Sequence, residues 1–478
     1  MIRMRHTLSV VDNHLKTMMK EAAVEIVRTL RERGHQSYLV GGCVRDMLLG
    51  REPADYDIAT DATPQQVMRV FPRTVEVGAR FGVVLVPVSL LGCHDGGQGT
   101  GEPRSVPGGS HPGCIEVATF RNDGIYSDGR HPDQVSFSRD PREDVRRRDF
   151  TINGLMLDPL DGGKVLDFVG GKEDLQAGIV RAIGDAASRF QEDKLRLLRA
   201  IRFAARFGYE IEPRTFAAVH ALAQEVRQVS KERVRDELTK MLTEGRAKRA
   251  FELLDESGLL GQVLPEVARM KGVEQPPQFH PEGDVWIHTL LLLEMLPPGC
   301  SRTLAWGALL HDVGKPPTFR VAPDRIRFDG HVEIGVRMAE EICRRFRFSN
   351  HDTEQITALV ANHMRFADVQ KMKESTFKRF ARLPDFAEHL ELHRIDCLGS
   401  HGMLDLYEYT KEKIAALPED EVFPAPLLTG NDLISEGYKP GPLFSEILAA
   451  VEDAQLEGRL HDRNDAMEFV RRQYPLAS

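Results

Sequence analysis

Two acidic residues one position apart, Asp55 and Asp57, are the first in this chain whose types and spacing could do chemistry. On a strand, side chains two positions apart point to the same face, so these two carboxylates would lie side by side. Without a cation, carboxylates held that close repel each other and raise each other's pKa. Mg²⁺ takes oxygen ligands and shares them with substrate phosphates, so the pair predicts a magnesium-dependent site that handles phosphates.

The residues before this pair predict how a phosphate would be held. Residues 38–40 form an apolar run typical of a buried strand, which stops at Gly41 and Gly42 and is followed by a short helix pattern closed by Gly50. Glycines let backbone N–H groups approach a triphosphate, and a helix N-terminus adds positive potential. A glycine pair or an Asp-x-Asp alone is most often a turn or a solvated surface. Together, in this order, they indicate a nucleotidyltransferase.

The segment from Tyr38 to Asp61, YLVGGCVRDMLLGREPADYDIATD, resembles the class II family of tRNA CCA-adding enzymes and bacterial poly(A) polymerases. Glu116, flanked by apolar neighbours on an expected strand, matches the family's third catalytic carboxylate before ATFR, although alone it could be a salt-bridged edge residue. RRDFTING (147–154) resembles the family's second motif, which handles sugar and phosphates, and LDFVGG (166–171) resembles its third. The resemblance implies two Mg²⁺ ions at the carboxylates and nucleotide binding by Gly41, Gly42, Arg45, Arg121, Arg148, Asp149 and Asn153.

Residues 188–208 predict one strong helix, on which Asp193 and Arg196, three positions apart, would share a face. A carboxylate accepts hydrogen bonds and a guanidinium donates them, so the pair could read the Watson–Crick edge of ATP or CTP. The alternative is a surface salt bridge. Together with Glu192 the pair resembles the family's EDxxR motif, which implies nucleotide selection by protein without a nucleic-acid template. Arg199 and Arg202 on the same helix are further expected nucleotide-binding residues, and residues 231–242 are expected to support this helix.

A second group of residues that could bind a metal centres on a histidine-aspartate doublet in GALLHDVGK, with a histidine upstream and an aspartate far downstream. It resembles the HD metal-dependent phosphohydrolase superfamily. Imidazole and carboxylate ligands suit Mn, Ni, Co, Fe or Zn better than Mg, and a bound ion would lower the pKa of water enough to attack a phosphate ester. Hydrolysis does not follow from the fold alone. The resemblance implies a first metal site of His288, His311, Asp312 and Asp396 and a second metal held by His331 and His363, with Lys315 nearby to steady a phosphate. The other histidines, His280, His351, His389 and His393, are read as ordinary core or surface groups.

The expected fold class is α+β. A polymerase-β-type nucleotidyltransferase head, with a small mixed sheet and helices, would be followed by an all-α neck, body, HD domain and tail. At 478 residues the chain is too long for a single core. The expected domains are a head at 21–184, a helical neck and body that binds RNA and the base at 185–273, an HD domain at 284–400 and a helical tail at 401–478. The true start could be Met1 or Met19.

Charge and cysteine content indicate which partners and which cellular compartment suit the protein. The net charge is −9, yet residues 181–249 hold 16 basic against 10 acidic residues, a local excess of +6 that favours contact with RNA phosphates. The 6 cysteines show no CxxC pair, which fits a reducing cytoplasm. No apolar run is long enough to span a membrane, and no signal peptide is expected.

Two segments of the sequence are expected to form loops. Residues 92–114 are a Gly/Pro/Ser-rich insertion that departs from the family's short hairpin, and their composition predicts a segment without a packed core. Cys93, His94, His111 and Cys114 could alternatively hold a zinc ion there. Residues 122–147 match a family loop that rearranges when the enzyme switches between nucleotides.

The sequence therefore predicts an enzyme that adds CCA, or part of it, to the 3′ end of tRNA from CTP and ATP. The alternatives are a poly(A) polymerase, against which GARFG at 78–82 argues, and an enzyme that adds only A or only CC. More distant ones are an HD phosphohydrolase with an inactive head and an inactive RNA-binding protein. The HD substrate and the formation of a homodimer stay open.

Overall fold

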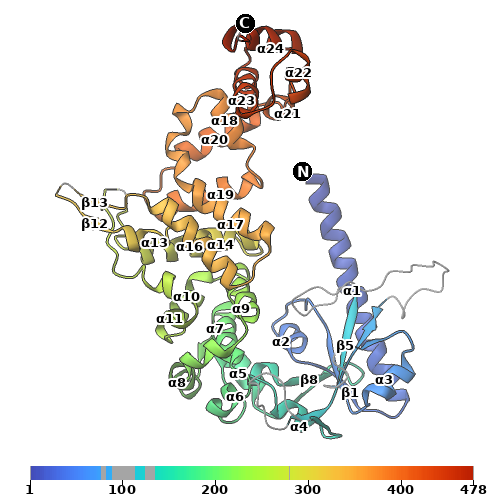
Figure 1. Ribbon diagram of the computed structural model, residues 1–478. Helices are drawn as coiled ribbons and strands as arrows, with labels where there is room; N and C mark the ends of the chain where they lie inside the picture. The colour runs from blue at the N-terminus through green and yellow to red at the C-terminus, as the bar shows by residue number, and fades with distance from the viewer. Residues whose placement is uncertain are drawn as a thin grey trace. The chain divides into compact units, whose positions relative to one another are not determined.

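The computed structural model describes residues 2–76, 82–88, 113–123, 135–278, 280–323 and 325–476. The chain divides into two compact units, Met1–Pro265 and Glu266–Ser478, which run from blue to green and from yellow-green to red in Figure 1. Most of the 92–114 insertion, the GARFG segment up to residue 81 and residues 124–134 of the second loop lie outside the described residues, as do Cys93, His94 and His111. The four domain boundaries expected from the sequence stay predictions.

A seven-stranded mixed sheet forms the centre of the first unit, with strand order β3-β4-β5-β2-β1-β8-β9. Within it only β2 and β5 pair in parallel, and the remaining neighbours are antiparallel. The strands are β1 (Ser37–Val40), β2 (Asp57–Thr60), β3 (Val75–Glu76), β4 (Val83–Pro87), β5 (Cys114–Thr119), β8 (Leu155–Asp158) and β9 (Lys164–Asp167).

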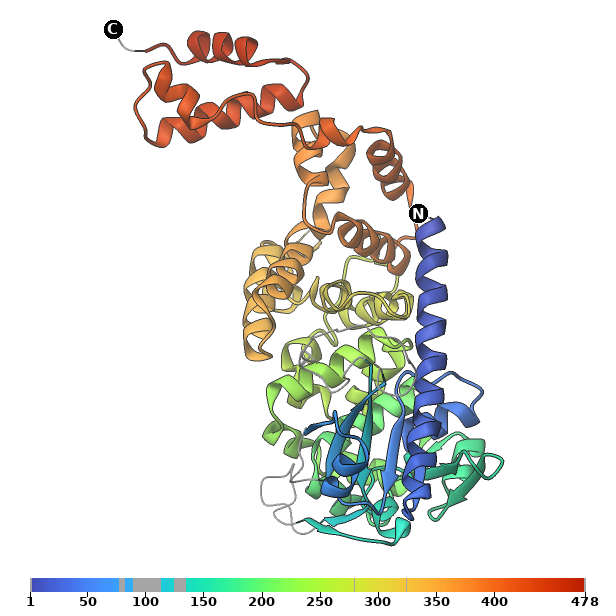
Figure 2. The ribbon, with the colours of Figure 1, turned by 90° about the vertical axis from the view of Figure 1, so that its right-hand side faces the viewer.

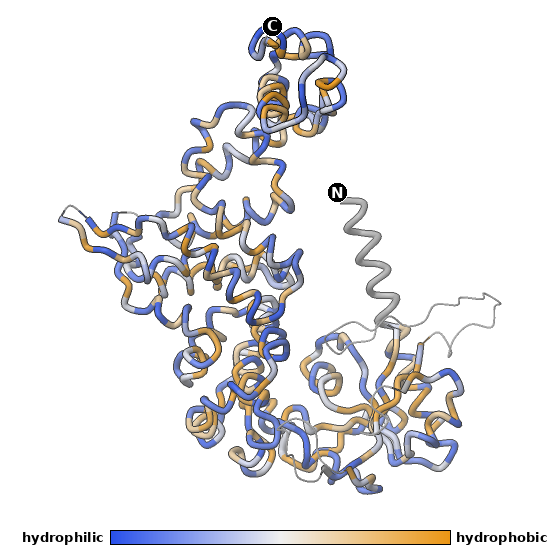
Figure 3. Tube along the Cα trace, in the orientation of Figure 1, coloured by the Kyte–Doolittle hydropathy of each residue, from blue (hydrophilic) through white to orange (hydrophobic). Residues whose placement is uncertain are grey.

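Helix α1 (Ile2–Glu32) packs on this sheet, against β1, β2 and β5. Ala23, Ile26, Val27 and Leu30 are fully buried, and their spacing places them on one helical face. Figure 2 shows this helix from a second side, and Figure 3 shows the apolar residues gathered along the strands. The other helices around the sheet are α2 (Gly42–Leu48), α3 (Pro64–Val70), α4 (Pro141–Arg146), the 3₁₀ turn η3 (Thr151–Asn153) and α5 (Gly171–Ala177).

Apart from two short strand pairs, the rest of the first unit is helical, as expected, but the helix predicted over residues 188–208 is broken. It consists of α6 (Ala186–Glu192) and α7 (Leu195–Phe207), and Asp193 between them is extended, with φ −138° and ψ 105°. The Asp193 carboxylate accepts the N–H of Leu195 at 3.1 Å, a local bond that competes with helix continuation. The remaining elements are the short parallel pair β10 (Ile179–Val180) and β11 (Glu210–Ile211), α8 (Pro213–Ala221), η4 (Ala223–Gln228), α9 (Lys231–Thr243), α10 (Ala247–Glu256) and α11 (Leu260–Val263).

Ion pairs tie α7 to α9. Arg202 donates to Glu237 at 2.6 Å, and the two side chains are 6% and 4% exposed. Arg206 pairs with Glu244 at 3.2 Å. These two of the 16 basic residues in 181–249 are therefore paired with acidic residues of the neighbouring helix.

Replacing Glu237 with alanine should lower the free energy of unfolding by about 2–4 kcal/mol, because it removes the nearest partner of the buried Arg202 guanidinium and leaves only Glu244, at 3.5 Å. Urea unfolding followed by circular dichroism measures this change. Glu210→Ala is the matched control, because Glu210 is 84% exposed and 3.8 Å from Arg249, and removing such a pair should cost less than about 1 kcal/mol. Equal losses in both variants would contradict the expectation.

The second unit is helical apart from the hairpin β12 (Arg320–Val321) and β13 (Ile326–Arg327). Two glycines allow its helices to approach closely. A Cβ on Gly314 would meet the carbonyl oxygen of His331 at 2.0 Å, and one on Gly307 would meet Leu359 at 2.6 Å. The helices are α12 (Pro265–Ala268), α13 (Val285–Met295), α14 (Arg302–Leu310), α15 (Lys315–Thr318), α16 (His331–Arg345), α17 (Asn350–Asn362), η5 (His363–Lys371), α18 (Glu374–Ala381), α19 (Phe386–Gly399), α20 (Asp405–Ala416), α21 (Glu419–Val422), α22 (Gly430–Ser435), α23 (Pro442–Leu456) and α24 (Arg463–Gln473).

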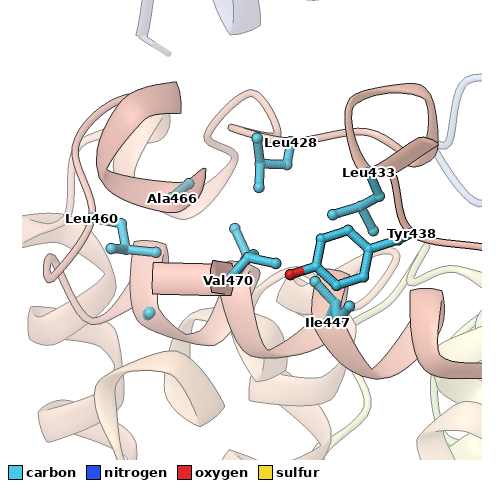
Figure 4. Close-up of a cluster of buried hydrophobic side chains, with 9 residues drawn as sticks. Leu428, Leu433, Tyr438, Ile447, Leu460, Ala466 and Val470 are labelled. Atoms are coloured by element: carbon cyan, nitrogen blue, oxygen red, sulfur yellow. The ribbon is translucent and has the colours of Figure 1, made fainter. Parts of the chain in front are cut away.

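The last three helices enclose an apolar cluster of their own, drawn in Figure 4. Leu433, Ile447 and Val470 are fully buried there, and the Tyr438 hydroxyl donates to the carbonyl of Tyr474 at 2.8 Å. Arg379 on α18 joins this cluster to the preceding helices through Glu452, at 2.6 Å. No helix of the described residues is both long enough and apolar enough to cross a membrane.

Candidate active sites

The acidic residues of the head meet where β2 and β5 pair. Asp57, the first residue of β2, lies opposite Glu116 on β5, so both side chains are on one face of the sheet. Burial raises the pKa of Asp57 to about 7, helped by the Glu116 and Asp55 carboxylates and opposed by Arg148. This concentration of negative charge fits a divalent cation by the chemistry of its donors.

Asp55 does not lie on the strand that its spacing predicted. It is an exposed residue in the bend before β2, because the pairing of β1 with β2 begins only at Val40 and Asp57. The alternation of side chains along a strand therefore does not define the direction of the Asp55 side chain. The Asp55 charge nevertheless helps to raise the pKa of Asp57. Among the described residues, the trios of ligand atoms within 4.8 Å of one another all lie in the second unit. The magnesium ligand set of the head stays a prediction.

The glycine turn lies against the second motif. Gly41 has φ 74°, a conformation that favours glycine, and a Cβ there would meet Nη1 of Arg148 at 3.0 Å. Arg148 in turn donates to Asp144 at 3.0 Å, and Arg147 donates to the same carboxylate at 2.6 Å. Asp144, which is fully buried, is a positioning residue that the motif comparison had missed. Its place on α4, three and four residues before the arginines that follow the helix, could have indicated it.

A hydrogen-bonded chain joins α2, the second motif and α7. Arg45, 4% exposed, donates to Asn153 at 2.6 Å, and Asn153 donates to Asp149 at 3.1 Å. Arg199 donates twice to Asp149, at 2.8 and 2.6 Å. Burial alone would raise the pKa of Asp149, but Arg199, Asn153 and Arg196 lower it to about 2. These four predicted nucleotide-binding residues bind one another, so each can position its neighbours.

The predicted base-reading pair has separate partners. Asp193 accepts from Arg233 on α9 at 2.8 Å. Arg196 donates to Glu192 at 2.7 Å and to the carbonyl of Arg147 at 2.9 Å. The shared helical face inferred for the pair is wrong, since Asp193 precedes α7. Arg121 lies on β6 (Arg121–Asp123), which pairs with β7 (Val135–Phe137).

In the second unit, three histidines are oriented alike. The Nδ1 atoms of His311, His331 and His363 lie 2.8, 3.0 and 2.7 Å from the carbonyl oxygens of Ala308, Phe328 and Val360. Such bonds place the proton on Nδ1 and leave the Nε2 lone pair for a ligand, as in histidine–metal sites. This arrangement is built from helix ends: His311 follows α14, His331 begins α16 and His363 begins η5.

Asp312 lies between two groups of ligands. Its Oδ2 is 3.1 Å from His311 Nε2, and its Oδ1 is 3.8 Å from His363 Nε2 and 4.0 Å from His331 Nε2. The two groups, each within 4.8 Å, are His288, His311 and Asp396, and Asp312, His331 and His363. All six residues predicted from the sequence are thus brought together.

The donor atoms of this site fit a transition metal. Asp312 Oδ1, His331 Nε2 and His363 Nε2 are buried without a hydrogen-bond partner, and an unpaired buried polar atom is costly unless an ion binds it. Burial lowers the pKa of His363 to about 4, so its imidazole is neutral, as a metal ligand must be. Lys315 Nζ forms an ion pair with Asp312 Oδ2 at 2.7 Å and donates a hydrogen bond to Gln275 at 2.6 Å. The site opens into a cavity of about 590 Å³ lined also by Arg325, Phe328, Met364 and Met403.

Known protein families and known enzymes match most of the chain. Three family profiles match: "Poly A polymerase head domain" over residues 37–181, "Probable RNA and SrmB- binding site of polymerase A" over 208–271, and "HD domain" over 284–397. A CCA-adding enzyme of Leuconostoc mesenteroides is 31% identical over 454 residues, which cover 95% of this chain and 96% of that enzyme. The chain belongs to the family of CCA-adding enzymes.

Other CCA-adding enzymes support this assignment. One from Geobacillus thermodenitrificans is 39% identical over 248 residues, so that alignment spans about half of both proteins, 52% of this chain and 55% of the relative. The crystal structure of the Bacillus stearothermophilus CCA-adding enzyme in complex with CTP has a TM-score of 0.68 at 26% identity and covers 95% of this chain and 98% of that one. The predicted α+β fold and the nucleotidyltransferase class are confirmed, and poly(A) polymerase is not favoured.

Two residues of the HD site were not predicted from the sequence. Glu282 contacts His288 at 2.9 Å and His280 at 2.8 Å, so His280, expected as an ordinary core or surface group, is bonded to a neighbour of the site. His389, by contrast, is buried as a core residue would be, but neither ring nitrogen has a hydrogen-bond partner. The signal that could have indicated Glu282 is its position in HPEGD, immediately before the helix that carries His288.

Proposed function

We propose that this member of the family extends the 3′ end of tRNA with CTP and ATP. The observation that carries the proposal is the register of Asp57 opposite Glu116, one strand away from the Gly41 turn. Family membership indicates the class of reaction. The position of Asp57 and Glu116 near the Gly41 turn indicates where in the head it would take place.

In this proposal, Asp55, Asp57 and Glu116 hold the magnesium ions, which supply charge neutralisation for phosphoryl transfer when bound. The RNA 3′-hydroxyl attacks the α-phosphorus of the nucleotide, and pyrophosphate leaves. Gly41 and Gly42 offer backbone N–H groups to the triphosphate beside Arg148. The chain from Arg45 through Asn153 and Asp149 to Arg199 keeps the glycine turn in a constant position relative to α7.

The reaction is tested with three tRNA substrates: one without CCA, one ending in C and one ending in CC. Each is incubated with purified protein and either CTP or ATP, and product lengths are read on a sequencing gel. CTP should extend the first two and ATP only the third. Long A tails would indicate a poly(A) polymerase, and extension of only one substrate would indicate an A-only or CC-only enzyme.

Arg196 is proposed to contribute to the choice of base. Arg196→Ala should reduce discrimination against UTP and GTP by about tenfold or more, since one lost charge-assisted hydrogen bond is worth about 1.5–3 kcal/mol. Single-nucleotide incorporation with each of the four triphosphates measures it. Arg189→Ala is the control, because Arg189 also pairs with Glu192, at 2.9 Å. Unchanged discrimination in Arg196→Ala, or equal use of all four nucleotides by the unmodified enzyme, would refute the role.

We propose phosphohydrolysis as a second activity, at the six-residue site around Asp312. The observation that favours it is the set of unpaired Nε2 and carboxylate atoms facing one another beside an open cavity. Mn, Ni, Co, Fe or Zn would activate water there when bound. Release of nitrophenol from bis(p-nitrophenyl) phosphate, with each metal in turn, tests this activity. No release with any of them would refute it.

The predicted RNA contacts lie within residues 185–273 and should follow the shape and backbone of the acceptor stem. The proposed setting is the cytoplasm, and the 5 cysteines among the described residues are free thiols. A homodimer is an open proposal, which sedimentation of the purified chain would test.

A further inference from the structure

His288 lies between two sets of neighbours, one at each ring nitrogen. Its Nε2 is 3.1 Å from Asp396 Oδ1 and 3.2 Å from His311 Nε2. Its Nδ1 is 2.9 Å from Glu282 Oε1 and 3.4 Å from the carbonyl oxygen of Gly399. The ring is fully buried, so these neighbours alone decide which nitrogen carries the proton.

A neutral imidazole offers one lone pair and one N–H. Both neighbours of Nδ1 are oxygen acceptors, so Nδ1 donates its proton to Glu282. Without a metal, Nε2 also faces an acceptor, the Asp396 carboxylate. A metal ion held by Asp396 and His311 would replace the proton on Nε2, so in the metal-bound site the Nε2 lone pair would serve the ion and Nδ1–H would face Glu282. By distance, His280, Glu282 and His288 could also hold a metal. With His288 Nδ1 protonated, that trio is instead a hydrogen-bonded chain, in which Glu282 Oε1 also contacts His280 Nδ1 at 2.8 Å.

His288 differs in this respect from the other three histidines of the site. His311, His331 and His363 are oriented by backbone carbonyls, which no side-chain substitution removes. His288 is oriented chiefly by a carboxylate. A carboxylate partner fixes the tautomer and also makes the imidazole a stronger ligand.

We propose that Glu282 is the positioning residue of the HD metal site: it holds His288 with Nε2 toward the ion and strengthens that ligand. The proposal rests on the proposed metal site and adds a residue to it. Glu282 contacts Nδ1 of His288, whereas Nε2 faces Asp396 and His311, so the effect of Glu282 on a bound ion would pass through the His288 ring.

The test measures Co²⁺ affinity of the full-length chain by visible absorption and chelator competition, in an Asp55→Ala, Asp57→Ala background that removes the head site. Glu282→Ala should bind Co²⁺ about 10–100-fold more weakly, the usual cost of losing such a partner. Glu282→Gln should lie between, because its amide oxygen still accepts from Nδ1. Glu354→Ala, an exposed carboxylate of the same unit, should bind as tightly as the parent.

Thermal unfolding of the metal-free proteins separates positioning from mere stability. A Co²⁺ affinity of Glu282→Ala within twofold of the parent would overturn the proposal, whether or not the variant unfolds at a lower temperature. If Glu282→Ala does not fold, Glu282→Gln decides: affinity equal to the parent, with an unchanged Co²⁺ spectrum, would overturn it. Absence of Co²⁺ binding by the parent would instead refute the metal site on which the proposal rests.

Discussion

Replacing Asp57 with asparagine should reduce CTP and ATP incorporation by at least about 1,000-fold, with tRNA affinity unchanged. The substitution preserves the shape of the side chain and removes one negative charge from the pair with Glu116. Metal-assisted phosphoryl transfer depends on several kcal/mol of charge stabilisation, which corresponds to a rate loss of that order. Single-turnover incorporation measures the rate, and filter binding measures the affinity for tRNA.

The matched control is Glu52→Gln, because Glu52 is an exposed carboxylate of the loop that leads to Asp57. It should keep the activity of the unmodified enzyme within about twofold, as a surface charge without a specific role would. An Asp57→Asn variant that retains a tenth of the activity would show that the catalytic ions are held elsewhere.

Replacing Asp312 with asparagine should reduce phosphodiester hydrolysis to background, a loss of at least about 1,000-fold, while CCA addition continues. Asp312 Oδ1 and Oδ2 face different histidines, so one substitution weakens both groups of ligands. The protein would lose the charge stabilisation and the activated water that the ions supply. Metal content after dialysis and nitrophenol release measure the two effects.

Asp329→Asn is the control for this experiment, because Asp329 lines the same cavity but is exposed and pairs with Arg320 at 2.7 Å. It should bind metal as the parent does. Parallel loss of CCA addition in Asp312→Asn would point to a folding defect, which circular dichroism would detect.

The sequence predicted which residues of the second unit lie together better than it did for the first. The six predicted HD residues belong to chemically distinctive types in a recognisable order, and the structure brings them together; their role as metal ligands stays a prediction. Glu282 escaped because a carboxylate two positions before an N-capping Asp284 is unremarkable in one dimension. Its role depends on the ring orientation of His288, which only three-dimensional packing decides.

In the head, strand periodicity failed at Asp55 and helical periodicity failed at Asp193. Both residues lie at an element boundary, where a local bond or the start of strand pairing overrides the repeat. Part of the positive charge of residues 181–249 is bound inside the protein, since Arg199, Arg202 and Arg233 pair with acidic partners. Counting charges cannot distinguish an internal ion pair from a surface for RNA.

The antiparallel register of β4 with β5 ends at Pro87 opposite Cys114. This pair joins the two strands before the glycine-rich insertion departs, only two residues from Glu116. Lengthening or shortening the chain beyond the Pro87–Cys114 pair leaves the spacing of the acidic residues unchanged. A fluorophore or affinity tag introduced beyond this pair would therefore report on the protein without displacing the predicted magnesium ligands.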